Sequence, residues 1–377
     1  MRELAPHLLE WAAAGDAYAV ASVVAVTGSA PRRPGAALAV RSDGTVVGSV
    51  SGGCVEGAVY ELAQEVLASG TPELAHFGYS DEDAFAVGLT CGGELDVFVQ
   101  AVPPPSPGVP DAFTTAHRAV CAGHPAALAR VISGPGRLRG RAVALVGGEP
   151  CGTTGDPGLD AAILSDARAR LDSGRTGVCG YGARDQPGGQ DVRVLIESWP
   201  PPARLLVFGS TDYASTVATI GAFLGYRVTM CDARAVFTTE ERFPTAHELV
   251  VDWPHRYLTR TETDRRTAVC VATHDPKFDI PLLAEALRKP LAYVGALGSR
   301  RVHTDRLRRL REAGLTDEQL ARLRSPVGLD IGALTPEETA VAIAAELIAA
   351  RSGGSGRPLS AVETPIHPEA HPLAQTP

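Results

Sequence analysis

The chain of 377 residues is 45% hydrophobic, so it can bury more than one core, and we expect two or three domains. A formal net charge of −8, with lysine only at Lys277 and Lys289, argues against a nucleic-acid or anionic-membrane surface. The seven cysteines include no Cys-x-x-Cys pair, which argues against structural zinc, and their odd number argues against a disulfide framework. No apolar run reaches membrane-span length and the N-terminus lacks a signal-peptide core, so we expect a cytoplasmic protein without a membrane partner.

Residues 1 to 103 are predicted to form one α/β unit. A β-branched run from Ala19 to Thr27 leads into a turn of glycine, proline and arginine that includes Arg32. A helix is predicted from Val55 to Ala68, and a last strand from Leu95 to Val102 ends at three prolines that indicate a linker.

Two short motifs in this unit each place one thiol beside a pair of glycines. They are Ser51-Gly52-Gly53-Cys54-Val55-Glu56 and Thr90-Cys91-Gly92-Gly93. Paired glycines let backbone N–H groups approach a ligand, and the N-terminus of the helix after Cys54 favours an anion or a thiolate. The alternative is a pair of tight turns that carry small buried cysteines.

Residues 104 to 202 repeat the plan of the first unit, which predicts a duplication. In the second copy, Gly155-Asp156-Pro157-Gly158 replaces the Cys54 motif, and nothing answers to the Cys91 motif. The fold therefore does not require these cysteines, which favours a functional role for them. Adding 104 to a residue number maps Gly44 on Gly148, Gly48 on Gly152, Glu56 on Asp160 and Gly70 on Gly174.

From residue 203 to 350, strands and helices alternate, which predicts a Rossmann-like, doubly wound parallel sheet. Gly209 follows the first strand and Asp232 ends the second, at the places where a dinucleotide-binding fold has its first glycine and its ribose-binding acid. Thr211, however, replaces the glycine that would let a pyrophosphate approach the backbone. We therefore expect an altered ligand site and no tight NAD(P) binding.

Two later turns of this domain are further candidates. His274 follows the fourth strand at its carboxyl end, where it could handle protons or orient a polar group, or could only make turn hydrogen bonds. Gly298-Ser299-Arg300-Arg301 opens a basic helix whose N–H groups and guanidiniums favour phosphate, unless this is only a solvated helix face. The Gly-, Ser- and Pro-rich segment from 351 to 377 is expected to be disordered.

Five motifs taken together resemble the XdhC/CoxI family of xanthine dehydrogenase accessory factors, over roughly residues 1 to 350. The motifs are Gly28-Ser29-Ala30-Pro31-Arg32-Arg33-Pro34-Gly35, the Cys54 and Cys91 motifs, Tyr293-Val294-Gly295-Ala296-Leu297-Gly298-Ser299-Arg300-Arg301 and Gly328-Leu329-Asp330-Ile331-Gly332. The resemblance implies a homo-oligomeric chaperone that binds molybdenum cofactor and passes it to a molybdenum hydroxylase apoenzyme of the xanthine or carbon monoxide dehydrogenase type. It also implies work with a cysteine desulfurase, which supplies the terminal sulfido ligand.

The cofactor is an anionic, phosphate-bearing pterin that holds its metal through sulfur, so a host needs N–H-lined turns, guanidinium groups and a soft donor. Under the resemblance, Cys54 and Cys91 are placed near the molybdenum or its sulfur. Two other functions remain open: an NAD(P)-dependent oxidoreductase that uses the Rossmann-like domain, and a structural adaptor. The residues expected to contact the cofactor are Arg32, Ser51, Gly52, Gly53, Cys54, Glu56, Cys91, Gly92, Gly93, Gly209, Asp232, His274, Gly298, Ser299, Arg300 and Arg301.

Overall fold

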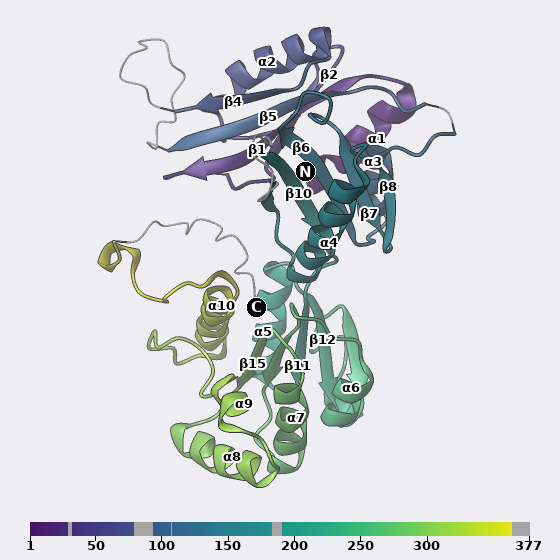
Figure 1. Cartoon of the computed structure of the whole chain (residues 1–377). Helices are drawn as coiled ribbons and strands as arrows, with labels where there is room; N and C mark the ends of the chain where they lie inside the picture. Colours follow the sequence, from purple (N-terminus) through teal and green to yellow (C-terminus); the bar gives the residue numbers. More distant parts are fainter. Residues whose placement is uncertain (29–31, 79–92, 107, 183–190, 364–377) are drawn as a thin grey trace. The chain divides into compact units, whose positions relative to one another are not determined.

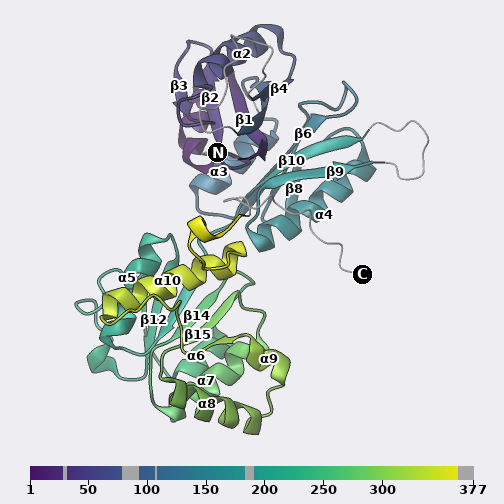
Figure 2. The ribbon, with the colours of Figure 1, turned by 90° about the vertical axis from the view of Figure 1, so that its left-hand side faces the viewer.

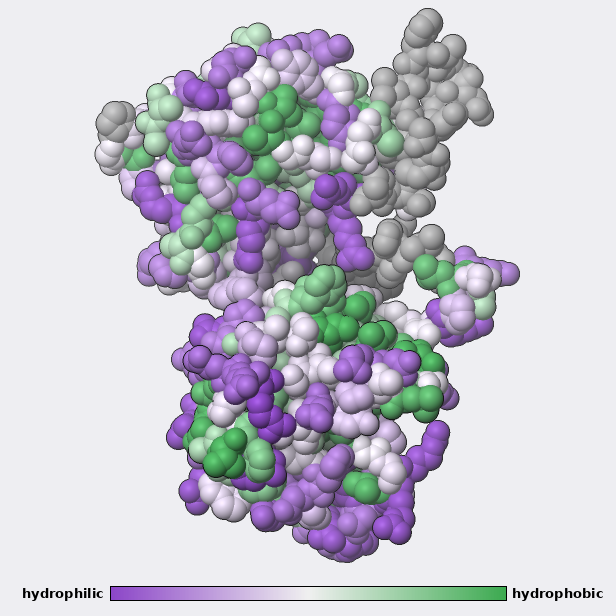
Figure 3. All heavy atoms as spheres, turned by 180° about the vertical axis from the view of Figure 1, so that it is seen from behind, coloured by the Kyte–Doolittle hydropathy of each residue, from purple (hydrophilic) through white to green (hydrophobic). Residues whose placement is uncertain are grey.

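The computed structural model describes residues 1–28, 32–78, 93–106, 108–182 and 191–363 of the chain (Figure 1). The chain divides into two compact units, Met1–Pro201 and Pro202–Val362. Within the described ranges, no helix combines the length and the apolar character that a membrane span requires. The surface seen in Figure 3 mixes polar and apolar residues, and its apolar residues form small groups.

The first unit contains two antiparallel sheets with the same strand order, β3-β2-β1-β5-β4 and β8-β7-β6-β10-β9. Each sheet is built from a segment that runs helix, three strands, helix, two strands. The first comprises α1 (Ala5–Ala14), β1 (Tyr18–Thr27), β2 (Ala37–Arg41), β3 (Val46–Gly48), α2 (Glu56–Ser69), β4 (Glu73–Phe77) and β5 (Glu94–Val102). The second comprises α3 (Ala112–Cys121), β6 (Ala126–Ser133), β7 (Ala142–Val146), β8 (Glu149–Gly152), α4 (Pro157–Ser173), β9 (Gly177–Tyr181) and β10 (Val192–Trp199).

The two copies pack on each other through residues at equivalent positions. One buried cluster consists of Val24 with Ile132 and Phe98 with Leu195, and Leu74 and Val178 pack against it. Phe98 and Leu195 are equivalent residues of the two copies, and so are Leu74 and Val178. The strand registers show this, because Leu74 pairs with Phe98 on the neighbouring strand as Val178 pairs with Leu195. The first unit is therefore an internal pseudo-dimer that buries apolar surface between its two sheets.

Two glycines show that the approach between the copies is close on both sides. A Cβ at Gly35 would lie 2.6 Å from Thr176, and a Cβ at Gly140 would lie 2.8 Å from Pro72. Both glycines also have positive φ, +92° and +79°, which other residues rarely adopt. Any side chain at either position would strain the backbone and push the copies apart.

The second unit is a parallel sheet of strand order β13-β12-β11-β14-β15-β16, the 3-2-1-4-5-6 arrangement of a Rossmann fold. Together with the two repeated α/β segments, this sheet confirms the predicted fold class. The strands are β11 (Arg204–Phe208), β12 (Arg227–Asp232), β13 (Glu248–Val251), β14 (Ala268–Val271), β15 (Tyr293–Ala296) and β16 (Leu323–Arg324).

Helices cover both faces of this sheet, as Figure 2 shows. Buried residues of α5 (Asp212–Phe223) and α10 (Pro336–Ser352) pack in a cluster on one face. The helices on the other face contribute Leu258, Leu282, Leu310 and Leu320 to a second cluster. They are α6 (Pro254–Arg260), α7 (Pro276–Arg288), α8 (Arg300–Glu312) and α9 (Asp317–Ala321).

Candidate functional site

Three connections that carry sequence motifs leave the first sheet at the same end. Thr27 at the end of β1 pairs with Glu94 at the start of β5, and Leu38 near the start of β2 pairs with Gly48 at the end of β3. Because the strands are antiparallel, the ends of β1, β3 and β4 and the starts of β2 and β5 all lie at this end. These connections contain the Arg32 turn, the Cys54 motif and the Cys91 motif.

The Cys54 turn is organised by the carboxylate of Glu56, the first residue of α2. Its Oε1 accepts hydrogen bonds from the Ser49 hydroxyl at 2.7 Å and from the N–H groups of Ser51 and Gly52 at 2.9 Å. Its Oε2 accepts from the Ser51 hydroxyl and from the N–H of Gly53 at 2.8 Å. The turn therefore carries its own anion at the helix N-terminus.

This arrangement corrects one expectation about the motif. We expected open N–H groups that could receive an anionic ligand, but Glu56 already occupies those of Ser51, Gly52 and Gly53. The N–H of Cys54 is also engaged, since it donates to the Ser51 hydroxyl at 2.9 Å. The helix begins at Glu56 rather than at Val55, because Val55 is its N-cap residue.

Electrostatics keep Glu56 ionised in this turn. Partial burial favours the neutral acid, but the hydrogen bonds from Ser51 and Ser49 outweigh it and lower the pKa of Glu56 far below its usual value. On the outer side of the turn, a Cβ at Gly52 or Gly53 would meet no atom within 4 Å. Gly52 and Gly53 are exposed, and Cys54 next to them is half-buried.

The second copy contains the same device without the thiol. Asp160 Oδ2 accepts from the Thr153 hydroxyl at 2.6 Å, and its Oδ1 accepts from the N–H of Thr154 at 2.9 Å. The pKa of Asp160 is lowered too: burial opposes the shift, and the hydrogen bonds from Thr153 and Thr154 produce it. A carboxylate-bound turn thus belongs to the repeated fold, whereas Cys54 is specific to the first copy.

The remaining first-unit candidates are only partly described. Cys91 and Gly92 lie outside the described residues, and Gly93 directly precedes β5. Arg32 is exposed. Over the described ranges, no group of three or more His, Cys, Asp and Glu side chains is arranged to hold a metal ion.

In the second unit, Asp232 is fully engaged at the end of β12. Its Oδ1 accepts from the N–H and the Nε of Arg234, both at 2.9 Å, and its Oδ2 accepts from the N–H of Ser210 and from Arg234 Nη2, both at 2.7 Å. Because a carboxylate offers about four acceptor positions, none is left for a ribose hydroxyl. The pKa of Asp232 is lowered: burial opposes the shift, and the hydrogen bonds from Arg234 and Ser210 outweigh it.

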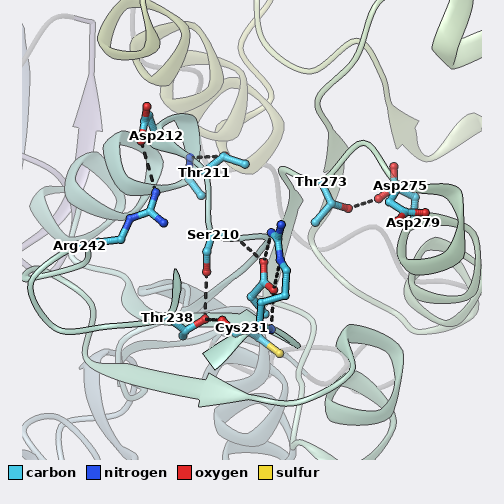
Figure 4. A network of polar contacts seen from close by, with 12 residues as sticks. Ser210, Thr211, Asp212, Cys231, Thr238, Arg242, Thr273, Asp275 and Asp279 are labelled. Atoms are coloured by element: carbon cyan, nitrogen blue, oxygen red, sulfur yellow. Dashed lines mark hydrogen bonds and ion pairs between the residues drawn. The ribbon is translucent and has the colours of Figure 1, made fainter. Parts of the chain in front are cut away.

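The first turn of the Rossmann fold is equally closed (Figure 4). A Cβ at Gly209 would lie 2.4 Å from the Thr273 side chain, so this glycine serves close packing between the loops after β11 and β14. The hydroxyl of Thr211 caps α5 by accepting from Ala214 at 3.2 Å. Asp212 adds a negative charge at the helix N-terminus, where a dinucleotide would place its pyrophosphate.

His274 is exposed, whereas Thr273, the residue before it, takes part in buried polar contacts. Thr273 donates a hydrogen bond to Asp279, and Arg306 pairs with Asp279 at 2.9 Å in the interior. The other hydrogen bonds of Arg306 go to the carbonyl of Leu297 at 3.0 Å and to the hydroxyl of Ser325. Arg306 thereby fixes the loops that follow β14 and β15.

The motif after β15 forms the start of α8. Ser299 is the N-cap of this helix and accepts from Val302 at 3.3 Å. Gly298 has φ +150°, and Arg300 and Arg301 are exposed. Gly209, Asp232, His274 and this motif all follow carboxyl ends of parallel strands, so the fold brings the second-unit candidates to one sheet edge.

Arg234, which was not among the predicted site residues, neutralises Asp232 and approaches Asp275 across the sheet edge. The local signal was present as Asp232-Ala233-Arg234, because a residue two positions after a strand-end acid can fold back on it.

Comparison with known proteins shows similarity along most of the chain. Sequence profiles of the XdhC and CoxI family match residues 11–78, and those of the XdhC Rossmann domain match residues 205–347, which together exceed half of the chain. A crystal structure described as a xanthine dehydrogenase from Bacillus halodurans has 25% identity and a TM-score of 0.63, and the match covers 95% of this chain and 98% of that one.

Three curated relatives have similar lengths of match. The Escherichia coli K12 protein YqeB is 27% identical over 94% of this chain, but the match spans only 47% of YqeB. The E. coli K12 molybdenum cofactor insertion chaperone PaoD is 26% identical, with 89% of this chain and 84% of PaoD covered. A Bacillus subtilis 168 protein named as a probable xanthine dehydrogenase subunit is 26% identical, with 88% of this chain and 92% of that protein covered.

Proposed function

Because the chain belongs to the XdhC and CoxI family, we propose that it serves a molybdenum enzyme as an accessory protein that binds molybdenum cofactor and delivers it to the apoenzyme. The names of two relatives support an accessory role for a molybdenum enzyme, since one is a molybdenum cofactor insertion chaperone and another is named for xanthine dehydrogenase. Delivery to a hydroxylase of the xanthine or carbon monoxide dehydrogenase type and sulfuration with a cysteine desulfurase are the finer parts of the proposal. Residence in the cytoplasm and a homo-oligomeric state belong to it as well.

The observation that carries the proposal is the common location of the strand ends that flank the three first-unit motifs. Thr27, Gly48 and Glu94 lie at one end of one sheet, and in the sequence the segments next to them carry Arg32, Cys54 and Cys91. The second copy keeps the sheet and the carboxylate-bound turn but lacks both cysteines. Two thiols added at one end of a duplicated scaffold are suited to a soft metal or to sulfur transfer.

In this proposal Cys54 is the principal contact to the molybdenum or its sulfur. Glu56 holds the turn rigid by its hydrogen bonds, and the open side at Gly52 and Gly53 admits the cofactor. Cys91 is the second soft donor, and Arg32 supplies positive charge at the same sheet end. The cofactor is cargo here, and the protein performs no turnover of its own.

The geometry disfavours the alternative of an NAD(P)-dependent oxidoreductase. The acceptor positions of Asp232 are filled, and Asp212 places negative charge at the N-terminus of α5. A titration with NADH or NADPH tests this alternative: saturable micromolar binding with turnover of a carbonyl or hydroxyl substrate would replace our proposal.

The proposal is tested with protein purified from a host that makes the cofactor, by measuring bound molybdenum and pterin and the activation of an apo-hydroxylase. We expect near-stoichiometric cofactor, and loss of metal retention in Cys54→Ser and Cys91→Ser. Cys121→Ser is the matched control, because Cys121 is an exposed cysteine at the end of α3. If the wild-type protein neither carries nor takes up the cofactor, the function is wrong; if both cysteine variants retain it, only the assigned residues are wrong.

A further inference from the structure

The outer side of α10 carries a line of exposed apolar residues, which we call the α10 stripe. It consists of Leu334, just before the N-cap, with 86% of its surface exposed, Val341 with 50% and Ile348 with 41%. Val341 and Ile348 are two helical turns apart and share one side of the helix, and Leu334 continues the same spacing of seven residues before it. In Figure 2, α10 lies in front of the sheet and faces the viewer.

The outer side of α10 differs from that of an ordinary surface helix because it lacks charged residues. Between residues 340 and 350 the sequence has one charged residue, Glu346. Its carboxylate is turned inward, where it accepts hydrogen bonds from the Tyr293 hydroxyl at 2.6 Å and from the N–H of Gly328 at 2.9 Å. The inner side of α10 packs in the core with α5, so the helix is apolar on two sides. Such a helix is normally covered on both sides.

Leu334 is held in an exposed position by the start of the helix. Its N–H donates to the Glu338 carboxylate at 2.7 Å, and that carboxylate also closes the capping box with Thr335. An apolar residue directly before an N-cap often packs on the fourth helical residue, which here is the polar Thr339. The helix sequence therefore does not offer Leu334 that apolar partner.

The charges at the two ends of α10 make this side complementary to itself. Glu337 and Glu338 lie in the first turn and Arg351 in the last, and all three are exposed. If two copies of α10 pack antiparallel with Val341 opposite Ile348, the same register places Glu338 opposite Arg351. The two helix dipoles are then also opposed. A parallel pair would instead bring the two acidic turns together.

The middle of α10 permits a close approach of two such helices. Ala344 and Ala345 lie at the centre of this register, and Ala345 is half-buried on the side of the stripe. Small side chains at the point of contact let helix axes approach closely. Because each copy contributes the same residues, the contact has the two-fold symmetry of an isologous dimer.

We propose that the α10 stripe is a homodimer interface, in which α10 packs antiparallel on α10 of a second copy of this chain. The inference rests on the proposed function only for the expectation of a homo-oligomer, and it names the surface that forms it. Two paired helices cover less than the roughly 1,200–2,000 Å² of a standard interface, so we expect a reversible dimer with a Kd on the order of micromolar.

Sedimentation velocity of the full-length protein, over concentrations that bracket this range, tests the proposal. Val341→Glu and Ile348→Glu should each raise the Kd roughly tenfold or more, because the new carboxylate would be buried in an apolar contact without a partner. Val236→Glu is the matched control, since Val236 is a 77% exposed valine that follows β12, and its Kd should equal that of the wild type.

Charge reversal distinguishes a second copy from any other partner. Glu337→Arg and Arg351→Glu should each weaken the dimer, and the double variant should recover it, because the ion pair then forms in the opposite sense. Glu337 is chosen because Glu338 also closes the capping box. A different partner would not supply the compensating charge.

Disulfide cross-linking tests the direction of pairing. Oxidation of a mixture of Val341→Cys and Ile348→Cys proteins with copper phenanthroline should join position 341 of one copy to position 348 of the other, as identified by mass spectrometry. A parallel pair would join each variant to itself. Val236→Cys in place of Val341→Cys is the control and should give no such product with Ile348→Cys.

Three results would overturn the inference: a monomeric wild type at every concentration, a dimer that both glutamate variants leave unchanged, or no recovery in the charge-reversed double variant. A monomeric wild type whose Val341→Glu variant no longer binds the apo-hydroxylase would assign this surface to the client enzyme. The proposed function is tested separately, because we expect Val341→Glu to retain molybdenum cofactor as a monomer. A wild type that dimerises through α10 but carries no cofactor would keep the interface and remove the delivery role.

Discussion

Glu56 and Asp160 hold equivalent turns in the two copies of the first unit. Each accepts a hydrogen bond from a hydroxyl group seven residues earlier, that of Ser49 or of Thr153. Each also accepts from the backbone N–H of the next residue, at 3.2 Å for Val50 and at 2.9 Å for Thr154. The longer side chain of Glu56 additionally reaches the N–H groups before Cys54, so the copy that carries the thiol also has the more strongly fixed turn.

Glu56→Gln should lower the free energy of unfolding by about 1–3 kcal/mol, because an amide accepts at only one of its two terminal atoms and its NH₂ faces backbone donors. Urea denaturation followed by circular dichroism measures the change. Glu61→Gln, on the exposed side of the same helix, is the control and should differ little from the wild type. An equal loss in both variants would show that the charge of the helix, and not the turn, is responsible.

The stability of the first unit should fall in acid because of these carboxylates. The pKa values of Glu56 and Asp160 are lowered in the folded protein, so their stabilisation is complete above the ordinary values of 4.5 and 3.8 and is lost as the pH falls toward the folded values. Unfolding free energies measured between pH 7 and pH 3 should decline below about pH 4.5. The decline should be shallower in Glu56→Gln and shallowest when Asp160→Asn is added, and an unchanged slope in the double variant would contradict the assignment.

The sequence predicted the central strands and the repeat more fully than the edges. The strands predicted at Ala19 to Thr27 and at Leu95 to Val102 are β1 and β5, and each of them begins one residue earlier than predicted. β4 and β9 were missed, because these edge strands are half-exposed and gain order from pairing with β5 and β10 rather than from their own residues. α3 was missed within the expected linker, although Asp111 caps it by accepting from Thr114 at 2.9 Å.

For the candidate site, the sequence located the positions but not their partners. The repeat predicted that Glu56 corresponds to Asp160, and strand spacing predicted the place of Asp232. Neither pattern indicated that Glu56 closes the Cys54 turn or that Arg234 fills the acceptor positions of Asp232. A side chain's partner depends on rotamers and loop geometry, which spacing does not encode.

Arg130→Ala should destabilise the protein by about 3–5 kcal/mol, because it leaves the carboxylate of Glu197 buried without its cation. Arg130 and Glu197 lie 2.8 Å apart with side chains 0% and 1% exposed. The Ser22 hydroxyl accepts a hydrogen bond from Arg130 at 2.6 Å. The two residues occupy equivalent positions in the two copies, because Ser22 on β1 pairs with β2 and Arg130 on β6 pairs with β7. Ser22→Ala removes a neutral partner and should cost only about 1 kcal/mol. Thermal unfolding of the Arg130→Ala and Ser22→Ala variants measures the two losses of stability. If the losses are equal, Glu197 does not need the ion pair.

The second buried ion pair, Arg306 with Asp279, links α8 to α7, and the effects of removing its two partners should be strongly non-additive. Arg306→Leu should cost about 3–5 kcal/mol, since it leaves Asp279 unpaired in the interior, whereas adding Asp279→Leu should recover much of that loss by removing the buried charge. Burial already raises the pKa of Asp279, although Thr273 and Arg306 oppose the shift, and without Arg306 it should rise further. A group with a raised folded pKa gives its full stabilisation below the unfolded value and loses it as the pH rises. The free energy of unfolding of Arg306→Leu should therefore be closest to that of the wild type near pH 4 and furthest below it near pH 7. If the difference in urea midpoints between the variant and the wild type does not change with pH, an unpaired Asp279 is not the cause.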